Sequence, residues 1–438
     1  SIASFQVLSS TTITAVVGSG ATGAVSLTTA GGTAALSGFV FLPPSPSISS
    51  FHPTNGPVGT LVTITGTNLD NPTAINIGGV AAIPISFSGN TVVAMVMPGA
   101  TTGGVSISTV GGTSNAAGIF TINSAAIPNG QQGNKLVGSG SSTNDYQGYS
   151  VALSSDGNTA VIGGRYHLPR GGTWVFVRNG STWVQQGPVL AGTGFSGSII
   201  YQGSSVSISA DGNTLLTGGY NDASGKGAAW IFVRNGSTWT QQGTKLVPSG
   251  EVGNPNFGCT VALNADGNTA VIGGMNDASN KGAIWIFTRT GNTWSQQGGK
   301  LVGIGFDSTS SARQGSSVSI SADGKTVICG ARGESSDKGT ALIYKFAGGV
   351  WSQYKTKLQG TNKVVAPNEG FSVAMSGDGN TAITGGPYDG YGEGAFWIYS
   401  QNIDSSSQTT ITSFSPTSAR RGDTITITGT NLTGTSAI

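Results

Sequence analysis

The sequence predicts an all-β protein, and three observations indicate this class. One pattern recurs five times along the middle of the chain, and its Asp-Gly pairs begin at residues 156, 211, 266, 323 and 378, which are 55, 55, 57 and 55 residues apart. On both sides of each pair apolar and polar residues alternate, as in two short strands joined by a tight turn. Glycine supplies 72 of the 438 residues and charged residues only 9%, but hydrophobic residues, at 37%, suffice for packed β domains.

Each copy of the pattern contains four strand signals in the same order. The copy that starts at Ser205 reads SVSI, then TLLTGG after the Asp-Gly turn, then GAAWIFVR from Gly227, and then TWTQQG around Trp239. An Asn-Gly pair at 235–236 separates the third and fourth runs, and this pair favours a hairpin turn. A constant period filled by four short strands is typical of a β-propeller, in which each repeat forms one blade.

The fifth copy ends after its third strand, GAFWIYSQ from Gly394 to Gln401. Its expected fourth strand matches NGQQGNKLVG, from Asn129 to Gly138, which precedes the first copy. The sequence therefore predicts a five-bladed β-propeller over residues 126–402, with strand-swapped ring closure by a blade built from both ends of this segment. Such closure leaves no exposed sheet edge.

The repeats resemble the FG-GAP family, which includes the propellers of integrin α chains. Calcium-binding members of that family carry a D-x-[DN]-x-D-G loop, whereas the stretch around Asp156 reads L-S-S-D-G-N-T, with one acid. The resemblance implies the fold without the calcium site, and neither a metal nor another cofactor is expected. We interpret Asp156 and its equivalents as hairpin-turn residues.

Two flanking segments resemble each other at a constant offset of 363 residues. Residues 47–75 read SISSFHPTNGPVGTLVTITGTNLDNPTAI, and residues 410–438 read TITSFSPTSARRGDTITITGTNLTGTSAI. Both resemble the opening of an IPT/TIG domain, an immunoglobulin-like β-sandwich. We expect a complete domain at 44–125, the C-terminal half of a second at 1–43, where AGGT matches VGGT at 110–113, and the N-terminal half of a third at 403–438.

The two half-domains match complementary parts of the complete one. Placed tail to head, they would lack only the counterparts of residues 76–79. The hypothesis is that the chain is about one unit of a longer array, with copies of itself as head-to-tail partners, joined covalently or by strand complementation. The alternative is that the fit of the two halves is coincidental.

The composition and the motifs argue against several functions. A net charge of +2 gives no field for nucleic acid, and no 18-residue apolar run exists to span a membrane. Histidines occur only at 52 and 167, and no nucleophile, phosphate-loop or metal-ligand motif appears, so an enzyme is not expected. Cys259 and Cys329 occupy different positions of the repeat and are expected to be unpaired.

One loop series is a candidate ligand site. The connections between second and third strands place acids at one aligned position, with a histidine in the first repeat and tyrosines nearby, and such a ring of acids and tyrosines could hold a sugar or a cation. The alternative is that the acids form Asx turns in polar loops. The candidate residues are Asp222, Asp277, Glu334, Asp389, His167, Tyr166, Tyr220 and Tyr388.

The combination of domains resembles the giant repetitive surface adhesins and filaments of Bacteroidota and similar bacteria. The resemblance implies a non-catalytic, extracellular structural or adhesive protein of the bacterial cell surface, and the Thr- and Asn-rich, charge-poor surface favours export. The alternative is a carbohydrate-binding propeller module whose loop face contacts surface glycans.

Overall fold

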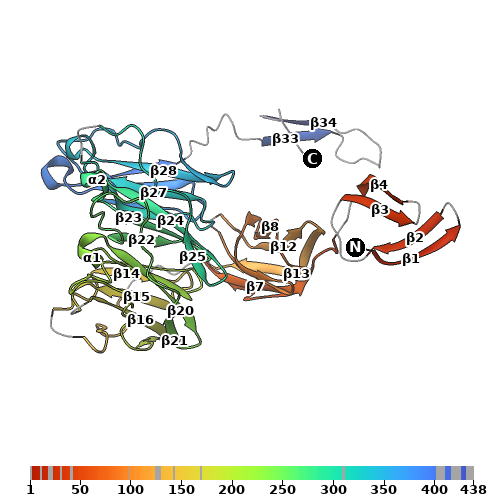
Figure 1. The fold of residues 1–438 in the computed structure, drawn as a ribbon, viewed down its shortest axis with the longest axis horizontal. Coiled ribbons are helices and arrows are strands. Elements are labelled where there is room, and N and C mark those ends of the chain that lie inside the picture. The colour runs from red at the N-terminus through yellow and green to blue at the C-terminus, as the bar shows by residue number, and fades with distance from the viewer. Residues whose placement is uncertain are drawn as a thin grey trace.

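The structure, a computed structural model, describes residues 2–9, 12–17, 23–29, 32–39, 43–97, 99–123, 130–141, 144–167, 170–307, 311–400, 410–415 and 426–430. This part of the chain is all-β. Figure 1 shows the five repeats on one side of a β-sandwich. The N-terminal hairpins, β1(Ile2–Ser9) with β2(Thr12–Val17) and β3(Gly23–Thr29) with β4(Gly32–Phe39), lie on its other side. The helical turns within the described ranges are each four residues long, too short to cross a bilayer.

The sandwich consists of two sheets that pack on a closed apolar core. One sheet has the order β10(Ile83–Ser88)–β11(Thr91–Met95)–β7(Leu61–Thr67)–β5(Ser47–His52), and the other β6(Asn55–Gly56)–β13(Gly112–Ile122)–β12(Gly103–Thr109)–β8(Ala74–Ile77)–β9(Val80–Ala81). In β7 the buried residues Val62 and Ile64 alternate with less buried threonines, as the period-2 pattern predicts. Both pack in the core with Phe51, Ile107 and Phe120.

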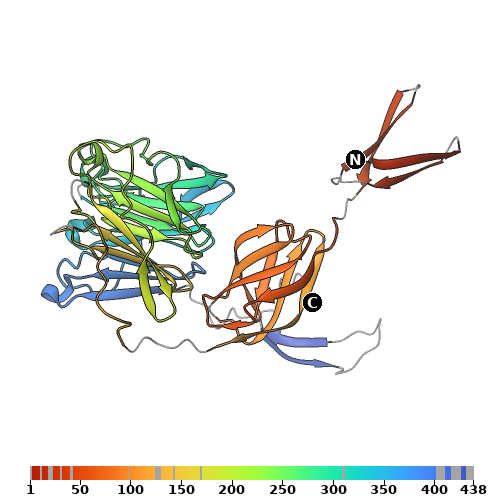
Figure 2. The ribbon, with the colours of Figure 1, turned by 90° about the horizontal axis from the view of Figure 1, so that it is seen from below.

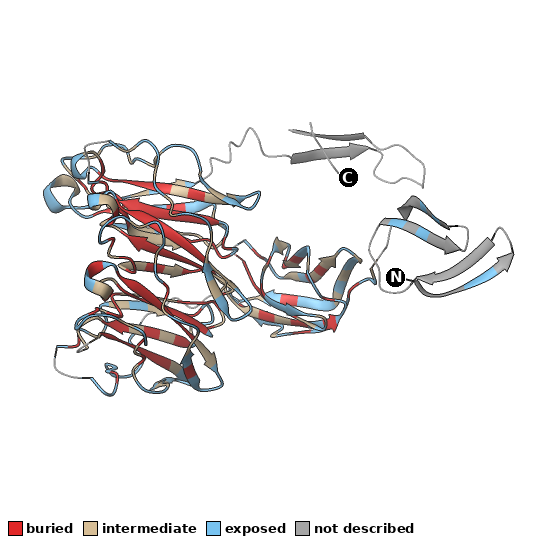
Figure 3. Cartoon of the chain, viewed as in Figure 1, coloured by how far each residue is buried: buried red, intermediate tan, exposed pale blue. Residues whose placement is uncertain are grey.

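Repeats 1 to 4 each form a four-stranded antiparallel sheet whose strands follow chain order. Figure 3 shows that the strands in the middle of these sheets carry most of the buried residues. The strands are β14(Ser150–Leu153), β15(Thr159–Gly164), β16(Gly172–Asn179) and β17(Thr182–Gln185) in repeat 1; β18(Ser205–Ile208), β19(Thr214–Gly219), β20(Ala228–Asn235) and β21(Thr238–Gln241) in repeat 2; β22(Thr260–Leu263), β23(Thr269–Gly274), β24(Ala283–Thr290) and β25(Thr293–Gln296) in repeat 3; β26(Gln314–Ile320), β27(Thr326–Ala331), β28(Thr340–Ala347) and β29(Val350–Gln353) in repeat 4.

Repeat 5 is a three-stranded sheet, β30(Ser372–Met375), β31(Thr381–Gly386) and β32(Ala395–Ser400). Of the fourth strand predicted at 129–138, residue 129 lies outside the described residues and 130–138 contain no strand. The prediction misplaced the strand, because the fourth strands of repeats 1 to 3 end at the first glutamine of QQG. That glutamine turns the chain: Gln185 Nε2 donates to the carbonyl of Gly187, as Gln131 Nε2 does to that of Gly133.

The turns between first and second strands owe their shape to side-chain hydrogen bonds. Ser154 Oγ donates to Asp156 Oδ1 at 2.5 Å, the backbone N–H of Asn158 donates to the same oxygen, and the N–H of Thr159 donates to Ser154 Oγ. The same three bonds recur around Asp211, Asp323 and Asp378. The turn carboxylate is therefore engaged by its own loop.

The tips of these turns form a chain of backbone hydrogen bonds from one repeat to the next. The N–H groups of Ser155, Ala210, Ala265 and Ala322 donate to the carbonyls of Ala210, Ala265, Ala322 and Gly377, respectively. We call the surface that carries these tips the turn face, and the opposite surface, which carries the connections between second and third strands, the loop face.

The sandwich packs on the turn face (Figures 1 and 2). Ile85, Met95 and Met97 form a buried cluster with Ala210 and Ala322. The first and the fifth tips also lie at the sandwich: Ser155 Oγ is 3.2 Å from Met95 Sδ, and a Cβ atom at Gly377 would be 3.4 Å from Met97 Cε. One end of the sandwich thus covers the centre of the turn face.

Repeats 1 and 5 leave apolar faces open that are covered between all the other repeats. The first strands of successive repeats contact one another from β14 to β30, but β30 and β14 do not form the corresponding interface. Val151 of repeat 1 is 69% exposed, whereas its counterparts Val206 and Val261 are 7% and 6% exposed. On repeat 5, Phe396 and Ile398 are exposed, although the residues at these positions in repeats 2 and 3 are buried.

The terminal segments form three hairpins in the described residues: β1(Ile2–Ser9) with β2(Thr12–Val17), β3(Gly23–Thr29) with β4(Gly32–Phe39), and β33(Thr410–Ser415) with β34(Thr426–Thr430). The β33–β34 pairing has the register of β5–β7 at the offset of 363, since Phe414 pairs with Ile427 as Phe51 pairs with Ile64. Likewise β3 and β4 turn at Thr29 and Gly32 as β12 and β13 turn at Thr109 and Gly112.

Candidate ligand-binding face

The loop face is assembled from two sets of connections. The first set links second and third strands and contains the short turns α1(Asp222–Gly225), α2(Asp277–Asn280), α3(Glu334–Asp337) and η1(Asp389–Gly392). The second set links successive repeats. Parallel bridges join the two sets at Gly171–Gln202, Gly227–Phe257, Gly282–Gln314 and Gly339–Glu369.

The predicted acids begin these turns, but three of them are buried and ion-paired. Each carboxylate contacts a lysine 23 residues further along the same repeat, and the pairs are Asp222–Lys245, Asp277–Lys300 and Glu334–Lys357. The carboxylates are at most 1% exposed, while the lysines are 18–20% exposed. Each carboxylate also accepts a backbone N–H, from Ser196, Val252 and Asp307, respectively.

Asp389 and His167 depart from this arrangement. Asp389 is partly buried and accepts the N–H of Val364 at 2.7 Å. His167 occupies the acid's position in repeat 1, where its Nδ1 lies 2.9 Å from Asp145 Oδ2 and its ring meets Trp174 edge-on. In repeat 1, Val189 occupies the position of the paired lysine of repeats 2 to 4. The acid and the lysine are therefore replaced together in this repeat.

These contacts tie each acid to its own repeat, and the structure does not bring the acids together into one open ring. Within the described ranges, no group of three or more His, Cys, Asp or Glu side chains is placed to hold a metal ion. What the arrangement does provide is a set of internal ion pairs that connect the loop face to the segments that follow β21, β25 and β29.

Glu334 illustrates the electrostatics of these pairs. Burial alone would raise the pKa of Glu334, but the hydrogen bonds from Lys357, Ser335 and the N–H of Asp307 outweigh it and hold this pKa below the ordinary value of 4.5. A lowered pKa in the folded state contributes stability that is complete above the unfolded value and lost as the pH falls through the folded value.

We therefore expect Glu334→Gln to change the acid response of the protein. Between about pH 6 and about pH 3, the free energy of unfolding of the variant should decline less than that of the parent chain, because the variant lacks this titration. Urea titrations at several pH values would measure both curves. Parallel declines would contradict the assignment.

The predicted tyrosines Tyr166 and Tyr220 belong to a strip of aromatic rings on repeats 1 and 2. The ring centroids of Tyr146 and Tyr166 are 4.9 Å apart, those of Tyr166 and Tyr201 5.3 Å, and those of Tyr201 and Tyr220 5.1 Å. We call these four residues the tyrosine strip. Tyr388 lies in repeat 5, and none of the ring contacts between described residues joins it to the strip.

Arg165 binds one edge of the tyrosine strip. Its guanidinium lies 4.0 Å from the ring centre of Tyr149 and 4.8 Å from that of Tyr166, and its Nη1 donates to the Tyr149 hydroxyl. Tyr146 is 59% exposed, and the other three rings are partly buried. Burial raises the pKa of Tyr220, against the opposing effect of Arg165. The strip therefore presents aromatic rings beside a cation.

The sequence alone did not find Glu369 as a buried group. Its carboxylate accepts the N–H of Gly360 and the hydroxyls of Thr384 and Tyr399, and it pairs with Lys363 at 2.6 Å. Burial and Glu369 raise the pKa of Tyr399 strongly. A signal for this role was present in the repeat alignment, because Glu369 aligns with Gln202 and Gln314. The side chains of these glutamines likewise accept a backbone N–H, from Gly192 and Gly303, respectively.

The two cysteines are free, as the sequence predicts. Cys329 is fully buried, and desolvation raises its pKa to about 12. Burial also raises the pKa of the Cys259 thiol, whose Sγ contacts the carbonyls of Gly273 and Gly315. Both thiols are therefore protonated and unreactive at neutral pH.

Comparison with protein families identifies the sandwich. Residues 46–123 match the model of the IPT/TIG domain. This part of the chain is a TIG domain. The TIG domain is thus the element that covers the turn face through Met95 and Met97. No curated protein matches the chain.

Solved structures that resemble the chain include propeller-like proteins of low sequence identity. Hydrazine synthase of Kuenenia stuttgartiensis is 14% identical over 57% of this chain and 59% of that chain, with a TM-score of 0.35. TolB from Acinetobacter baumannii is 13% identical over 57% of this chain and 51% of that chain, with a TM-score of 0.34. The chain thus spans little more than half the length of either protein, and likeness at this level carries no argument about function.

Proposed function

We propose that this chain is a non-catalytic structural and adhesive module of an extracellular, cell-surface protein. The observation that carries the proposal is the burial of the loop-face acids against lysines. Catalysis needs acids, bases or nucleophiles that can reach a substrate, and here Asp222, Asp277 and Glu334 stabilise the repeats instead. The tyrosine strip and Arg165 remain at the surface of the loop face, and aromatic rings beside a cation are suited to binding a ligand.

We also propose that the five repeats close into a five-bladed propeller. Ser155, at one end of the chain of turn tips, contacts Met95 of the TIG domain, and Gly377, at the other end, lies beside Met97, so the first and fifth repeats converge at the turn face. The residues on the open faces are equivalent to residues that are buried between the other repeats. They are Val151 on repeat 1, and Phe396 and Ile398 on repeat 5. Burying these side chains against each other supplies the driving force for closure.

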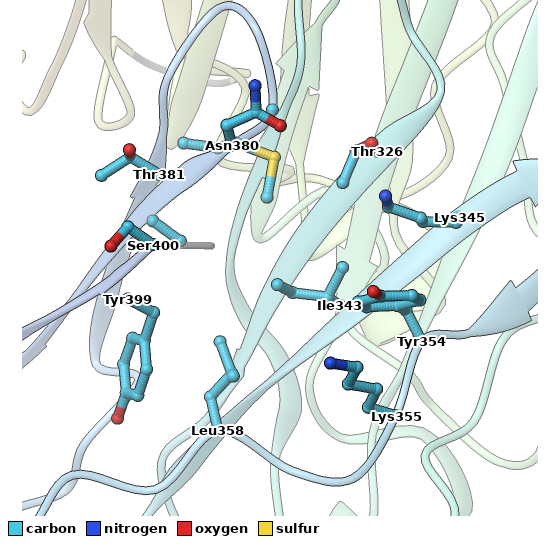
Figure 4. Close-up of a pocket in the computed structure, with 13 residues that line it drawn as sticks. Thr326, Ile343, Lys345, Tyr354, Lys355, Leu358, Asn380, Thr381, Tyr399 and Ser400 are labelled. Carbon is cyan, nitrogen blue, oxygen red and sulfur yellow. The ribbon is translucent and has the colours of Figure 1, made fainter. Parts of the chain in front are cut away.

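A pocket between repeats 4 and 5 supports the same closure (Figure 4). Its volume is about 510 Å³, and Ile343, Tyr354 and Leu358 of repeat 4 face Thr381 and Tyr399 of repeat 5 across it. In the preceding interfaces the tryptophan of a fourth strand contacts the previous repeat. Trp239 Nε1, for example, donates to Gln186 Oε1. The pocket is the corresponding space beside a repeat that has three strands.

The segment before repeat 1 already has the contacts of a closing segment. Trp183 Nε1 donates to Gln132 Oε1, as Trp239 does to Gln186, and Trp174 Nε1 donates to the carbonyl of Ser139, as Trp230 does to that of Thr193. Closure would bring Lys135 to the position that Lys245 has in repeat 2 and so give Asp389 a cation. This is the strand-swapped closure that the repeat alignment predicts.

The terminal hairpins support head-to-tail assembly with further copies. The β33–β34 hairpin has the register of β5–β7, and β3–β4 the register of β12–β13. Together the hairpins supply the two halves of a TIG sandwich, so we propose that successive units complete such a domain, within one longer chain or between chains. An array of rigid TIG domains and propellers is suited to reach from a cell surface.

A tandem protein with two copies of the chain tests this function. The two copies are joined through Asn-Ile-Gly-Gly, the sequence of residues 76–79. We expect limited trypsin digestion to spare Arg420 and Arg421 in the first copy, where the junction folds into a sandwich, and to cut the same site in the second copy. Small-angle scattering should show an elongated particle.

The matched control carries Ile427→Asp in the first copy, because Ile427 aligns with Ile64 of the TIG core. This variant should restore cleavage at the junction. Equal cleavage of both copies in the parent tandem would overturn the head-to-tail proposal.

The second candidate function is carbohydrate binding by the loop face. The tyrosine strip favours it, because one exposed and three partly buried aromatic rings, each with a hydroxyl group, present flat surfaces for sugar rings. This candidate is compatible with an adhesive role, since adhesion requires a ligand.

A further inference from the structure

The loop face has five equivalent backbones but unequal side chains. The residue at the positive-φ position before each first strand is Tyr146 in repeat 1 and Tyr201 in repeat 2, with φ of 55° and 57°. The equivalents in repeats 3 to 5 are Asn256, Arg313 and Asn368, with φ of 55°, 53° and 54°. The tyrosine strip is thus confined to repeats 1 and 2 of a fivefold-repeated frame.

The tyrosines at this position are not explained by the fold. Asparagine tolerates the left-handed conformation better than a bulky residue does, and it also performs a structural task here. Asn256 Nδ2 donates to the carbonyl of Tyr220, and Asn368 Nδ2 donates to those of Arg332 and Asp337. Tyr146 and Tyr201 make ring contacts in place of these hydrogen bonds. Bulky residues held at a positive φ cost conformational energy, and such residues are found preferentially at functional sites.

The charge beside the tyrosine strip is positive. The loop-face acids are neutralised by Lys245, Lys300 and Lys357, whereas none of the ion pairs within the described ranges involves an arginine. Arg165 stacks on Tyr149 and Tyr166, and its Nε has no hydrogen-bond partner among the described residues. A cation next to stacked rings selects a ligand that combines flat apolar faces with negative charge.

We propose that the tyrosine strip and Arg165 bind an anionic polysaccharide, a chain of sugar rings that carry carboxylates or sulfate esters. Sugar rings stack along the tyrosine strip, beginning at the exposed ring of Tyr146, and Arg165 pairs with an acidic substituent. The inference rests on the proposed adhesive function and names its ligand class. It also reverses the expected charge of the site, because the ligand is held by rings and arginine and not by the acids.

Binding to three defined polymers tests the proposal in the full chain. Polygalacturonate and its methyl ester differ only in the charge of the carboxyl groups, and λ-carrageenan carries sulfate esters without uronate. Isothermal titration should give tight binding to one or both anionic polymers and at least tenfold weaker binding to the methyl ester. Binding to polygalacturonate alone assigns the carboxylate, and binding to carrageenan alone assigns the sulfate.

Three substitutions are matched to residues that other repeats use at the same positions. Tyr146→Asn and Tyr201→Asn copy repeats 3 and 5, and Arg165→Met copies Met275 of repeat 3. We expect each tyrosine variant to weaken binding roughly tenfold, and Arg165→Met to remove the preference for the anionic polymer. Tyr391→Ala, which removes an exposed ring in repeat 5, should bind like the parent chain.

Thermal unfolding of each variant controls for folding, and two independent tyrosine variants keep the test valid if one is unstable. The proposal would be overturned if the neutral methyl ester bound as tightly as the more tightly bound anionic polymer, if binding were unchanged in both tyrosine variants, or if neither anionic polymer bound. The tandem proteolysis experiment does not depend on these results, so a failure here leaves the structural role standing.

Discussion

Asp277→Ala is expected to lower the free energy of unfolding by about 3–5 kcal/mol, because it leaves the ammonium of Lys300 without its partner inside the repeat. Asp277 is fully buried, and its carboxylate holds both Lys300 Nζ and the N–H of Val252. Removing the carboxylate leaves both the charge of Lys300 and the backbone N–H of Val252 without their partner. Chemical denaturation followed by tryptophan fluorescence measures the loss.

Two comparisons distinguish this effect from ordinary truncation. Asp277→Asn with Lys300→Met removes both charges but keeps an acceptor for Val252, and should be far less destabilising than Asp277→Ala. Lys226→Ala removes an exposed pair with Glu251 at 3.8 Å and should change stability by less than about 1 kcal/mol. If Asp277→Ala lost no more than Lys226→Ala, the acids would not have the structural role assigned to them.

Val151→Asp is expected to destabilise the repeats by about 3 kcal/mol or more, although Val151 is exposed in the open arrangement. In a closed propeller Val151 is covered by repeat 5 as Val206 is covered by repeat 1, so the substitution buries an unpaired carboxylate. Phe396→Asp, on the opposite face of the same seam, should have a similar effect.

The reference variants for this prediction lie inside and outside the repeats. Val206→Asp, at a covered interface, should lose as much stability as Val151→Asp, and Val110→Asp, at an exposed position of the TIG domain, should lose little. Stability of Val151→Asp equal to that of Val110→Asp would mean that the seam stays open.

Much of the architecture followed from local patterns. The five Asp-Gly turns and the order of strands within each repeat appear where the repeat period places them, because turn chemistry and period-2 alternation are encoded within a few residues. The complete TIG domain was predicted from its opening motif for the same reason. Cys259 and Cys329 are unpaired, as their different positions in the repeat indicated.

The candidate site was less accessible to sequence reasoning, because its properties depend on partners distant along the chain. The acids were interpreted as a ring that could hold a ligand, but their lysines lie 23 residues away and approach only when β21, β25 and β29 complete each sheet. The constant spacing was a usable signal, as was the joint replacement by His167 and Val189 in repeat 1. The packing of Met95 and Met97 on the turn face could not be predicted in this way, because a contact between two domains occurs once and does not recur with the repeat.

The fourth strand of repeat 5 shows a different limit. Asn129–Gly138 does match the other repeats in sequence. Most of the matched residues, however, belong to the connection that follows the fourth strand and not to the strand itself. Residues aligned with 132–138 are outside strands in repeats 1 to 3 as well. Closure therefore depends on how repeat 1 and its preceding segment meet repeat 5.

A disulfide across the seam tests closure most directly. In covered interfaces the first residue of one repeat touches the second residue of the next, since Val261 N–H donates to Ser205 Oγ at 3.0 Å. The corresponding pair at the seam is Ser372 and Val151. The variant carries Ser372→Cys and Val151→Cys with Cys259→Ser and Cys329→Val, and Ser205→Cys with Val261→Cys in the same background is the reference.

Mass spectrometry of peptides after mild oxidation reports which cysteines are joined. If the propeller is closed, an intramolecular disulfide should join the cysteines introduced at positions 372 and 151, and it should form as completely as the disulfide of the reference pair. A reference bond without a seam bond, or a seam bond found only between two chains, would contradict closure and with it the account of this protein as a sealed propeller that presents one loop face.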